Sequence, residues 1–564
     1  MKTKPLMKLT LMGKQSEKEV IINKLHHLGV LHVSELSPSD VLERDVPSKQ
    51  THVISDHLLK LRYLAEKTNV NITFTLDGLP DYSKVLKRSQ DFIDSLVDDV
   101  KKLDSEKQKV KQDIKKYESH IHIIESIPAP FTTEKIHFSK QRLEADKVVV
   151  GKGGYYYFGD VEGKVRLIDT SFVKKDSEST LKESKEKLDE LNKRLNEIDS
   201  RLFKKINGKQ STLRWLISSL ENYYEQGVIS QQFGKTELFF VVEGYIDPKH
   251  VDDVKSIDTL SVVVEPISKG PTLLQNKGII KHFEPLINMY GTPKYNSVDP
   301  TLIMAIFYPF FFGFMLSDIG YGLMMMVALA FIRYHYGTET KPILWIFGLS
   351  AVSSIIFGLI FGSFFGNLVY VTPLYNDSFS ASFEILQIAL IIGLVHINIG
   401  ILLALYQGHI QKEFVPTVLD VSHLYFLQLI LVAAFIQQYW LIYVSIALAV
   451  IVLLVRKGLI GLTDITGFFG IWFSYARLLA LSLATAGVAL AINIIADKVA
   501  EFAVVGPLLW VLVLVLGHTF NFVLNMIACV IHSARLHYVE QFSLFFKEGG
   551  EAFKPFKIKT KIKE

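Results

Sequence analysis

The stretch GFFGIWFSYARLLALSLATAGVALAINII (467–495) decides how the rest of the chain is interpreted, because it is long, apolar and carries a single charge, Arg477. As a helix rising about 1.5 Å per residue, it would place the guanidinium about 15 Å from its nearer end. That is near the middle of a hydrocarbon core about 30 Å thick. A guanidinium stays protonated, and burying it costs at least about 2.5 kcal/mol. The sequence therefore predicts a partner or a water-filled path for Arg477.

The composition divides the chain into two unlike halves. Residues 1–295 are rich in Lys, Glu, Asp and Ser, whereas 296–546 are almost continuously apolar; 49% of the 564 residues are hydrophobic. We predict an α+β cytoplasmic domain with a long antiparallel coiled coil, followed by an all-α polytopic membrane domain of about eight helices. A basic tail, 547–564, holds much of the small net charge of +4, so we infer no nucleic-acid partner.

Cysteine usage and the first residues predict the compartment. The one cysteine, Cys529, lies in an apolar stretch, which excludes an intrachain disulfide and fits a cytoplasmic first half. The opening MKTKPLMKLTLMG is too short and too interrupted by polar residues to be a signal peptide. We therefore expect the first half to stay in the cytoplasm.

Two strand–helix–strand patterns bracket the predicted cytoplasmic domain. Their strands are KLTLMG (8–13), VLHVSEL (30–36), ELFFVVEGYI (237–246) and TLSVVVEPI (259–267). Alternating apolar residues and flanking Gly or Asp-Pro breaks are typical of such strands. We predict two small α/β lobes at about 1–80 and 230–270, which could adopt a ferredoxin-like arrangement.

Two long helices with heptad spacing join these lobes. Apolar residues recur at spacings of three and four over about 85–127 and again over about 178–225. The strand-like segment 147–163 can reverse the chain between them, so the helices would run antiparallel. A folded helical bundle is the alternative, but the single narrow apolar stripe on each helix favours the coiled coil.

No motif in the sequence predicts an enzyme. GKGG (151–154) lacks the GxxxxGK[ST] spacing of a phosphate-binding loop. There is no HExxH, no CxxC pair and no nucleophile elbow either. We therefore expect a non-catalytic chain without a metal or cofactor of its own.

The second half contains eight predicted membrane spans. They lie at about 302–316, 319–334, 343–369, 383–406, 421–437, 439–456, 466–497 and 504–540. With the amino terminus inside, the basic residues gather in the cytoplasmic connections, and only Lys498 falls on the opposite side. We expect a multi-pass cell-membrane protein with both termini in the cytoplasm.

The last two predicted spans hold most of the polar residues of this half. Each exceeds 30 residues, or about 45 Å as a helix, so each must tilt or project beyond the bilayer. A polar stripe along a tilted membrane helix is what a water-accessible ion path requires. The residues expected to line the path are Arg477, Ser482, Thr485 and Asn493 in the first span and His518, Asn525, Arg535, His537 and Glu540 in the second.

Five segments resemble one known family. SYARLLALSLA (474–484) and HSARLHYVEQFSLFF (532–546) resemble the two signatures of the membrane a subunit of rotary V-type and A-type ATPases, called subunit I in bacteria. Similar to the same family are PTLLQNKGIIKHFEPLINMYGTPKYNSVDPT (271–301), FYPFFFGFMLSDIGYG (307–322) and FGLIFGSFFGN (357–367). The resemblance covers essentially the whole chain.

The resemblance implies a stator subunit beside a rotating proteolipid ring. In this family two offset aqueous half-channels lead to the ring, and a fixed arginine between them favours the ionised ring carboxylate and blocks a direct leak. Arg477 matches that arginine, and Arg535 matches a second one in the last span. The implied partners are the proteolipid c-ring, the peripheral stalk subunits, a central stalk or ring-capping subunit, the soluble catalytic ATPase sector and the lipid bilayer.

The chain departs from the family pattern at two positions. Thr485 stands where animal and fungal relatives have a histidine, and Asn525 stands where they have a glutamate. A titratable relay is therefore not expected at these positions, and water or hydroxyl contacts would serve instead. The coupling ion stays open between H⁺ and Na⁺.

Structural roles are the alternative for several polar residues. We interpret Asp318 as a turn residue on the outer face, because Gly320 and Gly322 follow it closely. We interpret His396 as a packing histidine with its hydrogen bonds satisfied. Two other protein classes are also considered: a secondary ion transporter or channel with a cytoplasmic coiled-coil regulatory domain, and a membrane-anchored scaffold without transport.

Overall fold

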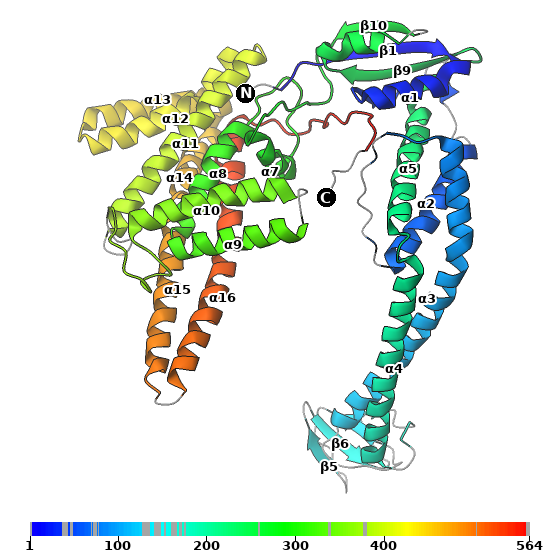
Figure 1. The fold of residues 1–564 in the computed structure, drawn as a ribbon. Helices are drawn as coiled ribbons and strands as arrows, with labels where there is room; N and C mark the ends of the chain where they lie inside the picture. Colours follow the sequence, from blue (N-terminus) through cyan, green and yellow to red (C-terminus); the bar gives the residue numbers. More distant parts are fainter. Residues whose placement is uncertain are drawn as a thin grey trace. The chain divides into compact units, whose positions relative to one another are not determined.

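The computed structural model describes residues 3–36, 43–44, 49–68, 70, 76, 78–126, 136–139, 148–151, 154–158, 166–168, 172–173, 176–257, 260–336, 340–375, 381–502 and 505–559 (Figure 1). The chain forms two compact units. The first consists mainly of Met1–Glu43 and Phe233–Lys557, and the second of Arg44–Gln232 and Ile558–Lys563. In sequence, the second unit is therefore an insertion into the first.

One antiparallel sheet in the first unit takes strands from both predicted α/β lobes. The strands are β1 (Met7–Lys14), β2 (Leu31–Ser34), β9 (Phe239–Ile246) and β10 (Ser261–Pro266), in the order β10–β1–β9–β2, with short β8 (Gly234–Lys235) and β3 (Glu43–Arg44) beyond β9. Helix α1 (Lys18–Leu28) connects β1 to β2, and α6 (Val251–Lys255) connects β9 to β10. This order is ferredoxin-like. The two predicted lobes thus share one sheet, in which each pair of strands gains neighbours that an isolated pair would lack.

The core of this lobe follows the alternation of its strands. Leu9 and Leu11 of β1 and Phe240 and Val242 of β9 have no exposed surface. Leu25 of α1 is equally buried. The apolar residues at alternate positions thus point to one face of the sheet, as the period of two requires.

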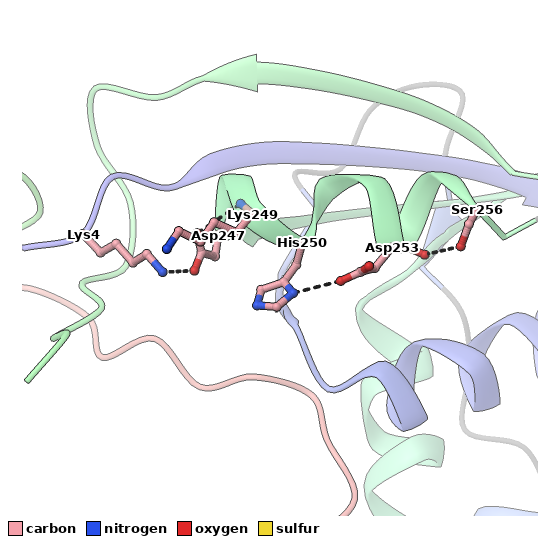
Figure 2. Close-up of polar contacts among 6 residues, drawn as sticks. All are labelled: Lys4, Asp247, Lys249, His250, Asp253 and Ser256. Carbon is pink, nitrogen blue, oxygen red and sulfur yellow. Dashed lines mark hydrogen bonds and ion pairs between the residues drawn. The ribbon is translucent and has the colours of Figure 1, made fainter. Parts of the chain in front are cut away.

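Polar contacts fix the turn between β9 and α6 (Figure 2). Lys4 forms an ion pair with Asp247, which directly follows β9, and the Asp247 carboxylate also accepts a hydrogen bond from the Lys249 N–H at 3.2 Å. One helical turn further on, the His250 ring and the Asp253 carboxylate are 2.9 Å apart. The segment before β1 is thereby held at the end of β9.

Residues 547–557 of the C-terminal tail form neither helix nor strand and run along the first unit. Thr272 donates its N–H to a tail carbonyl at 2.6 Å, and further along Phe556 donates its N–H to the Leu31 carbonyl at 2.8 Å. The Lys554 N–H donates to Nδ1 of His32 at 2.9 Å. Phe556 is only 2% exposed, so the tail has a buried anchor. Part of the predicted basic tail is therefore packed against the protein, and residues 560–564 lie outside the described residues.

Two long helices of the second unit pack against each other in opposite directions. They are α3 (Tyr82–Ser126) and α4 (Ser177–Ile206), close to the predicted starts. Ion pairs join Arg194 to Glu106 at 2.8 Å and Lys205 to Asp99 at 2.5 Å. Residue numbers that rise along α4 are therefore paired with numbers that fall along α3, so the helices are antiparallel. That this antiparallel pair is a coiled coil stays a prediction.

The second predicted heptad helix, 178–225, is divided in two. Helix α4 ends at Ile206, and α5 (Gln210–Ile229) begins after a short turn. Gly208 in this turn has a φ of 82°, which glycine adopts at little cost. Leu213 and Leu216, expected to continue the heptads, are instead buried in a core to which α2 (Lys49–Lys67) also contributes.

A small four-stranded sheet lies in the sequence between α3 and α4. Its strands are β4 (Ile136–Ser139), β5 (Val148–Gly151), β6 (Gly154–Phe158) and β7 (Arg166–Ile168), in the order β5–β6–β4–β7. The strand-like segment 147–163 supplies β5 and β6, which pair in antiparallel fashion. The rest of that segment, including 152–153 of GKGG, lies outside the described residues.

The second half of the chain is helical. A short α7 (Glu284–Tyr290) precedes α8 (Thr301–Leu316), α9 (Ile319–Tyr336), α10 (Lys341–Phe361), α11 (Ser382–Ile410), α12 (Phe414–Phe435), α13 (Tyr439–Lys457), α14 (Thr463–Phe473), α15 (Ala476–Ala500), α16 (Gly506–Arg535) and α17 (Phe542–Phe545). Within the described residues, six segments are long and apolar enough to cross a membrane: Lys341–Phe361, Ser382–Ile410, Phe414–Ala434, Tyr439–Arg456, Gly458–Ala500 and Gly506–Phe545. Helix α8 is apolar but shorter. The count of eight spans stays a prediction.

Three predicted spans have other bounds or a less regular helix in the structure. The span predicted at 343–369 ends as a helix at Phe361, because Gly362 follows in the left-handed conformation with a φ of 70°. The span at 466–497 is interrupted at residues 474–475, between α14 and α15. The span at 504–540 is α-helical to Arg535 and continues as a π-helix over Leu536–Gln541. π-Helical turns occur frequently at functional sites.

Docking of the tail should depend on pH through His32. Burial lowers the pKa of this histidine, which is 6% exposed and accepts the Lys554 N–H. In the undocked state the ring titrates near its ordinary value of about 6.5. As the pH falls below that value, the undocked state binds more protons and docking weakens, whereas above it docking is unaffected.

The measurement is hydrogen exchange of residues 551–556, expressed as protection factors at about pH 5.5 and pH 7.5. Protection should fall at the lower pH in the wild type, and the His32→Gln variant should lose this pH dependence. His27→Gln, on the exposed face of α1, is the matched control and should behave as the wild type. Equal protection at both pH values in the wild type would contradict the prediction.

Candidate functional site

Helices α15 and α16 carry most of the predicted path residues and pack side by side. Thr485 of α15 donates to Asn525 of α16 at 3.0 Å, and Asn493 lies 2.9 Å from His518. Residue numbers that rise along α15 are therefore paired with numbers that fall along α16, so the two helices are antiparallel (Figure 1). The structure divides the predicted residues into two groups along this pair.

The first group is a chain of hydrogen bonds at the end of the pair nearer the connection between α15 and α16. The His518 ring bonds to Asn493 through Nε2 at 2.9 Å and to the Tyr321 hydroxyl through Nδ1 at 2.9 Å. Asn521 donates to the same hydroxyl at 2.7 Å. Asn493 also donates to Asn367 at 2.8 Å. Tyr321 and Asn367 belong to neither α15 nor α16, so sequence reasoning did not include them.

The chain continues toward Arg477 through Asn521 and Asn525. Asn525 donates to the Asn521 side chain at 2.6 Å and accepts from Thr485 at 3.0 Å. Thr485 also donates to the Leu481 carbonyl at 2.9 Å. The Thr485–Asn525 contact joins α15 to α16, and that hydroxyl contacts serve in place of a titratable relay stays a prediction.

Ser482 contacts the residue that precedes a buried carboxylate in the chain, Asp318. The Ser482 and Ser317 hydroxyls are 2.7 Å apart. The next residue, Asp318, is 2% exposed and accepts hydrogen bonds from four groups. Its donors are the N–H of Tyr321 at 3.0 Å, the N–H of Phe365 at 3.0 Å, the N–H of Gly366 at 2.9 Å and the hydroxyl of Ser363 at 2.6 Å. Asp318 is a turn residue, as predicted, but it is buried and connects the turn to the loop after α10.

The second group surrounds Arg477, which is the second residue of α15. The interruption at residues 474–475 places it at the start of a helix rather than inside one continuous helix, as the sequence had suggested. Its Nη1 lies 3.9 Å from Oε1 of Glu540, which is in the π-helical segment and 1% exposed. This distance is longer than a hydrogen bond, so the guanidinium keeps donors for another acceptor.

His537 lies in the same π-helical segment and faces a histidine from another helix. The centroids of the His537 and His396 rings are 4.8 Å apart, and both rings are fully buried. His396 packs against Phe307 and Phe311, as expected for a packing histidine, and its Nδ1 is 2.7 Å from the Tyr475 hydroxyl. Its Nε2 has no hydrogen-bond partner in the described part of the chain, so the expectation of a fully satisfied ring stays a prediction.

Arg535 is placed differently from the other predicted residues. Its side chain is exposed, and the described residues provide no ion-pair partner for it. It therefore lies at the surface of this chain, at the junction of α16 and the π-helix. Within the described residues no cluster of three His, Cys, Asp or Glu side chains could hold a metal ion.

The sequence is similar to membrane subunits of rotary ATPases. Residues 161–389 match the V-type ATPase 116kDa subunit family. The chain is 32% identical to A-type ATP synthase subunit I of Methanocaldococcus jannaschii, over 59% of this chain and 57% of that protein. It is 33% identical to A-type ATP synthase subunit I of Pyrococcus horikoshii, over 61% and 58%, and 23% identical to V-type ATP synthase subunit I of Chlamydia trachomatis, over 60% and 65%. The matches cover less than two thirds of these relatives.

One solved structure is also similar. It is the crystal structure of the cytoplasmic N-terminal domain of subunit I, homolog of subunit a, of V-ATPase, with a TM-score of 0.24 and 9% identity over 46% of this chain and 99% of that chain.

The sequence matches confirm the predicted resemblance to subunit I of the rotary ATPase membrane sector. Together with its six long apolar helical segments, they make the chain a multi-pass membrane protein.

Replacing Asp318 by alanine should destabilise the membrane half. The change removes the acceptor of two backbone N–H groups of the loop after α10, one buried and one partly buried, and of the Ser363 hydroxyl. We expect a loss of about 3 kcal/mol in the free energy of unfolding. Asp318→Asn keeps one acceptor and should lose less.

Thermal unfolding in detergent would measure this effect. Asp497→Asn is the control, because Asp497 is exposed and its change should cost no more than about 0.5 kcal/mol. An Asp318→Ala protein that unfolds at the wild-type temperature would show that the three hydrogen bonds from residues 363–366 do not hold the loop.

Proposed function

We propose that this chain is the stator subunit of the membrane sector of a rotary V/A-type ATPase. It would provide two ion half-channels and the fixed arginine that faces the proteolipid ring, and it would couple ion movement to rotation of the ring. The chain itself would be non-catalytic, because ATP chemistry would belong to the soluble sector. Its similarity to subunit I proteins supports this proposal.

The observation that carries the proposal is the continuous polar chain between α15 and α16. It runs from Asn367 through Asn493, His518, Tyr321 and Asn521, and it ends at Asn525 and Thr485. Polar residues inside a membrane are costly and mark ion pathways. With both termini in the cytoplasm, this chain would lead from the outer side toward Arg477 and would form one half-channel.

Arg477 would be the fixed charge at the end of that chain. Its contact with Glu540 at 3.9 Å is loose, and its side chain is 20% exposed. A ring carboxylate approaching that exposed side would meet a cation that cannot lose its proton. The charge would favour release of the ion from the carboxylate and would repel cations crossing directly between the half-channels.

The remaining contacts of the complex follow from the same proposal. Exposed Arg535 would face the ring beside Arg477. The N-terminal half, with its α/β lobe and long helices, would link the membrane sector to the peripheral stalks and would approach the central stalk or ring-capping subunit. The soluble catalytic sector would be reached through these stalks.

Replacing Arg477 by glutamine should abolish ATP-driven ion uptake without preventing assembly. Glutamine keeps hydrogen-bonding capacity but removes the charge on which ion release depends. The measurement is uptake into vesicles carrying the assembled complex, with co-purification of the ring and stalk subunits as the test of assembly.

Arg333→Gln is the matched control, because Arg333 is an exposed arginine at the end of α9. It should transport as the wild type does. Persistent uptake in an assembled Arg477→Gln complex would show that this arginine is structural and would refute the mechanism.

A further inference from the structure

A cavity of about 380 Å³ lies where α12, α13, α14 and α17 meet. None of its described lining residues belongs to the hydrogen-bonded chain between α15 and α16. Its volume falls in the range of roughly 300–1,000 Å³ that is usual for small-molecule sites. One part of the lining is charged or polar, with Asp420, His423, Arg456 and Asp464. The other part is apolar, so the cavity has the two kinds of surface that an amphipathic ligand requires.

The charged part of the cavity lies at one edge of the membrane-spanning region. Arg456 is the last residue of the apolar segment Tyr439–Arg456, which has 18 residues. As a helix this segment is about 27 Å long, close to the thickness of about 30 Å of a hydrocarbon core. Asp420 of the neighbouring helix lies at the same level, because its Oδ1 is 2.6 Å from Nη2 of Arg456. The charged groups are therefore at the depth of the lipid headgroups.

Three contacts orient the Arg456 guanidinium. Besides its ion pair with the Asp420 carboxylate, its Nη1 donates to the Asp420 carbonyl at 3.0 Å and lies 3.4 Å from Nδ1 of His423. A guanidinium can only donate, so Nδ1 accepts and the His423 ring carries its proton on Nε2. These contacts use three of the five N–H donors of the guanidinium, which leaves donors for a phosphate oxygen.

The charges of the lining favour a ligand that carries both signs. Among the described lining residues, two carboxylates, Asp420 and Asp464, accompany one cation, Arg456. The Asp420 side chain is still 59% exposed beside Arg456, so it can also accept hydrogen bonds from a ligand. An anion alone would be repelled by the two carboxylates, and a cation alone by the guanidinium. A phosphate joined to an ammonium group complements both.

The apolar side chains lie next to the carboxylates in a regular order. Leu424 follows Asp420 by one helical turn on the same face of α12, and Phe468 follows Asp464 in the same way on α14. Both steps lead from the end of an apolar segment toward its middle. The lining therefore changes from charged at headgroup depth to apolar at the depth of the acyl chains. A soluble zwitterion would not need this second surface.

We propose that this cavity binds phosphatidylethanolamine, a phospholipid whose headgroup carries a primary ammonium. Arg456 would bind the phosphate, Asp420 and Asp464 would accept the ammonium N–H groups, and the acyl chains would lie along Leu424 and Phe468. Phosphatidylcholine has no N–H donor on its trimethylammonium group, and phosphatidylglycerol has no cation, so the site would discriminate against both. The inference does not rest on the stator function and needs only a chain that spans a membrane.

The test is native mass spectrometry of the full-length chain in detergent, stripped of co-purified lipid and titrated with lipids of identical acyl chains. The wild type should bind phosphatidylethanolamine about tenfold or more tightly than phosphatidylcholine, because the latter cannot make the charge-assisted hydrogen bonds. Arg456→Gln should weaken phosphatidylethanolamine binding by about the same factor. Asp464→Asn should reduce the preference for phosphatidylethanolamine over phosphatidylcholine.

Arg333→Gln is the matched control, because Arg333 is an exposed arginine near the end of another helix of the membrane half, and its lipid affinities should equal those of the wild type. Equal binding of the two lipids by the wild type would overturn the inference, and this comparison needs no variant to fold. Unchanged affinity in a folded Arg456→Gln protein would also overturn it. If water-soluble phosphoethanolamine displaced the lipid at equal concentration, the site would bind a soluble phosphate ester, and the assignment to a lipid would be wrong.

Discussion

The antiparallel packing of α15 against α16 is the constraint on which the membrane half depends. Each helix contributes amide, hydroxyl or imidazole groups that would be costly in a hydrocarbon environment on their own. When the two helices pack together, these groups form hydrogen bonds with one another, as Thr485 does with Asn525 and Asn493 does with His518. The order of polar residues along α15 is therefore matched by the reverse order along α16. A shift of one helix turn between them would leave several of these groups unpaired.

The sequence predicted the local features of this chain better than the long-range ones. Apolar length and periodicity predicted α11 and α13 to within a few residues, because membrane helices are specified by composition over a single segment. The strands β1 and β9 were predicted as strands, and their place as neighbours in one sheet followed only from the ferredoxin-like arrangement that the two strand–helix–strand patterns suggested. Their pairing joins residues more than 200 positions apart, and no local pattern reports it.

The interruption of the helix before Arg477, between α14 and α15, is another feature that the local sequence does not predict. The residues Ser474 and Tyr475 are neither glycine nor proline, so nothing in the local sequence indicates that α14 ends there. The Tyr475 hydroxyl contacts His396, 79 residues earlier, and this tertiary contact lies at the turn. All nine predicted path residues are in described segments, and eight have contacts within the membrane half. The functional role of each stays a proposal, and Tyr321 and Asn367 are members of the hydrogen-bonded chain that only the fold brings in.

The burial of Asp318 has a consequence for how the protein enters its membrane. Three of the four groups that donate hydrogen bonds to its carboxylate belong to residues 363–366, about 45 positions later in the chain. When only α8 and α9 have left the ribosome, those three partners do not yet exist, and the carboxylate lacks the hydrogen bonds that they donate. The turn between α8 and α9 can therefore form these hydrogen bonds only after α10 and the loop that follows it have been synthesised. The order of synthesis thus imposes an order of assembly on the first three helices of the membrane half.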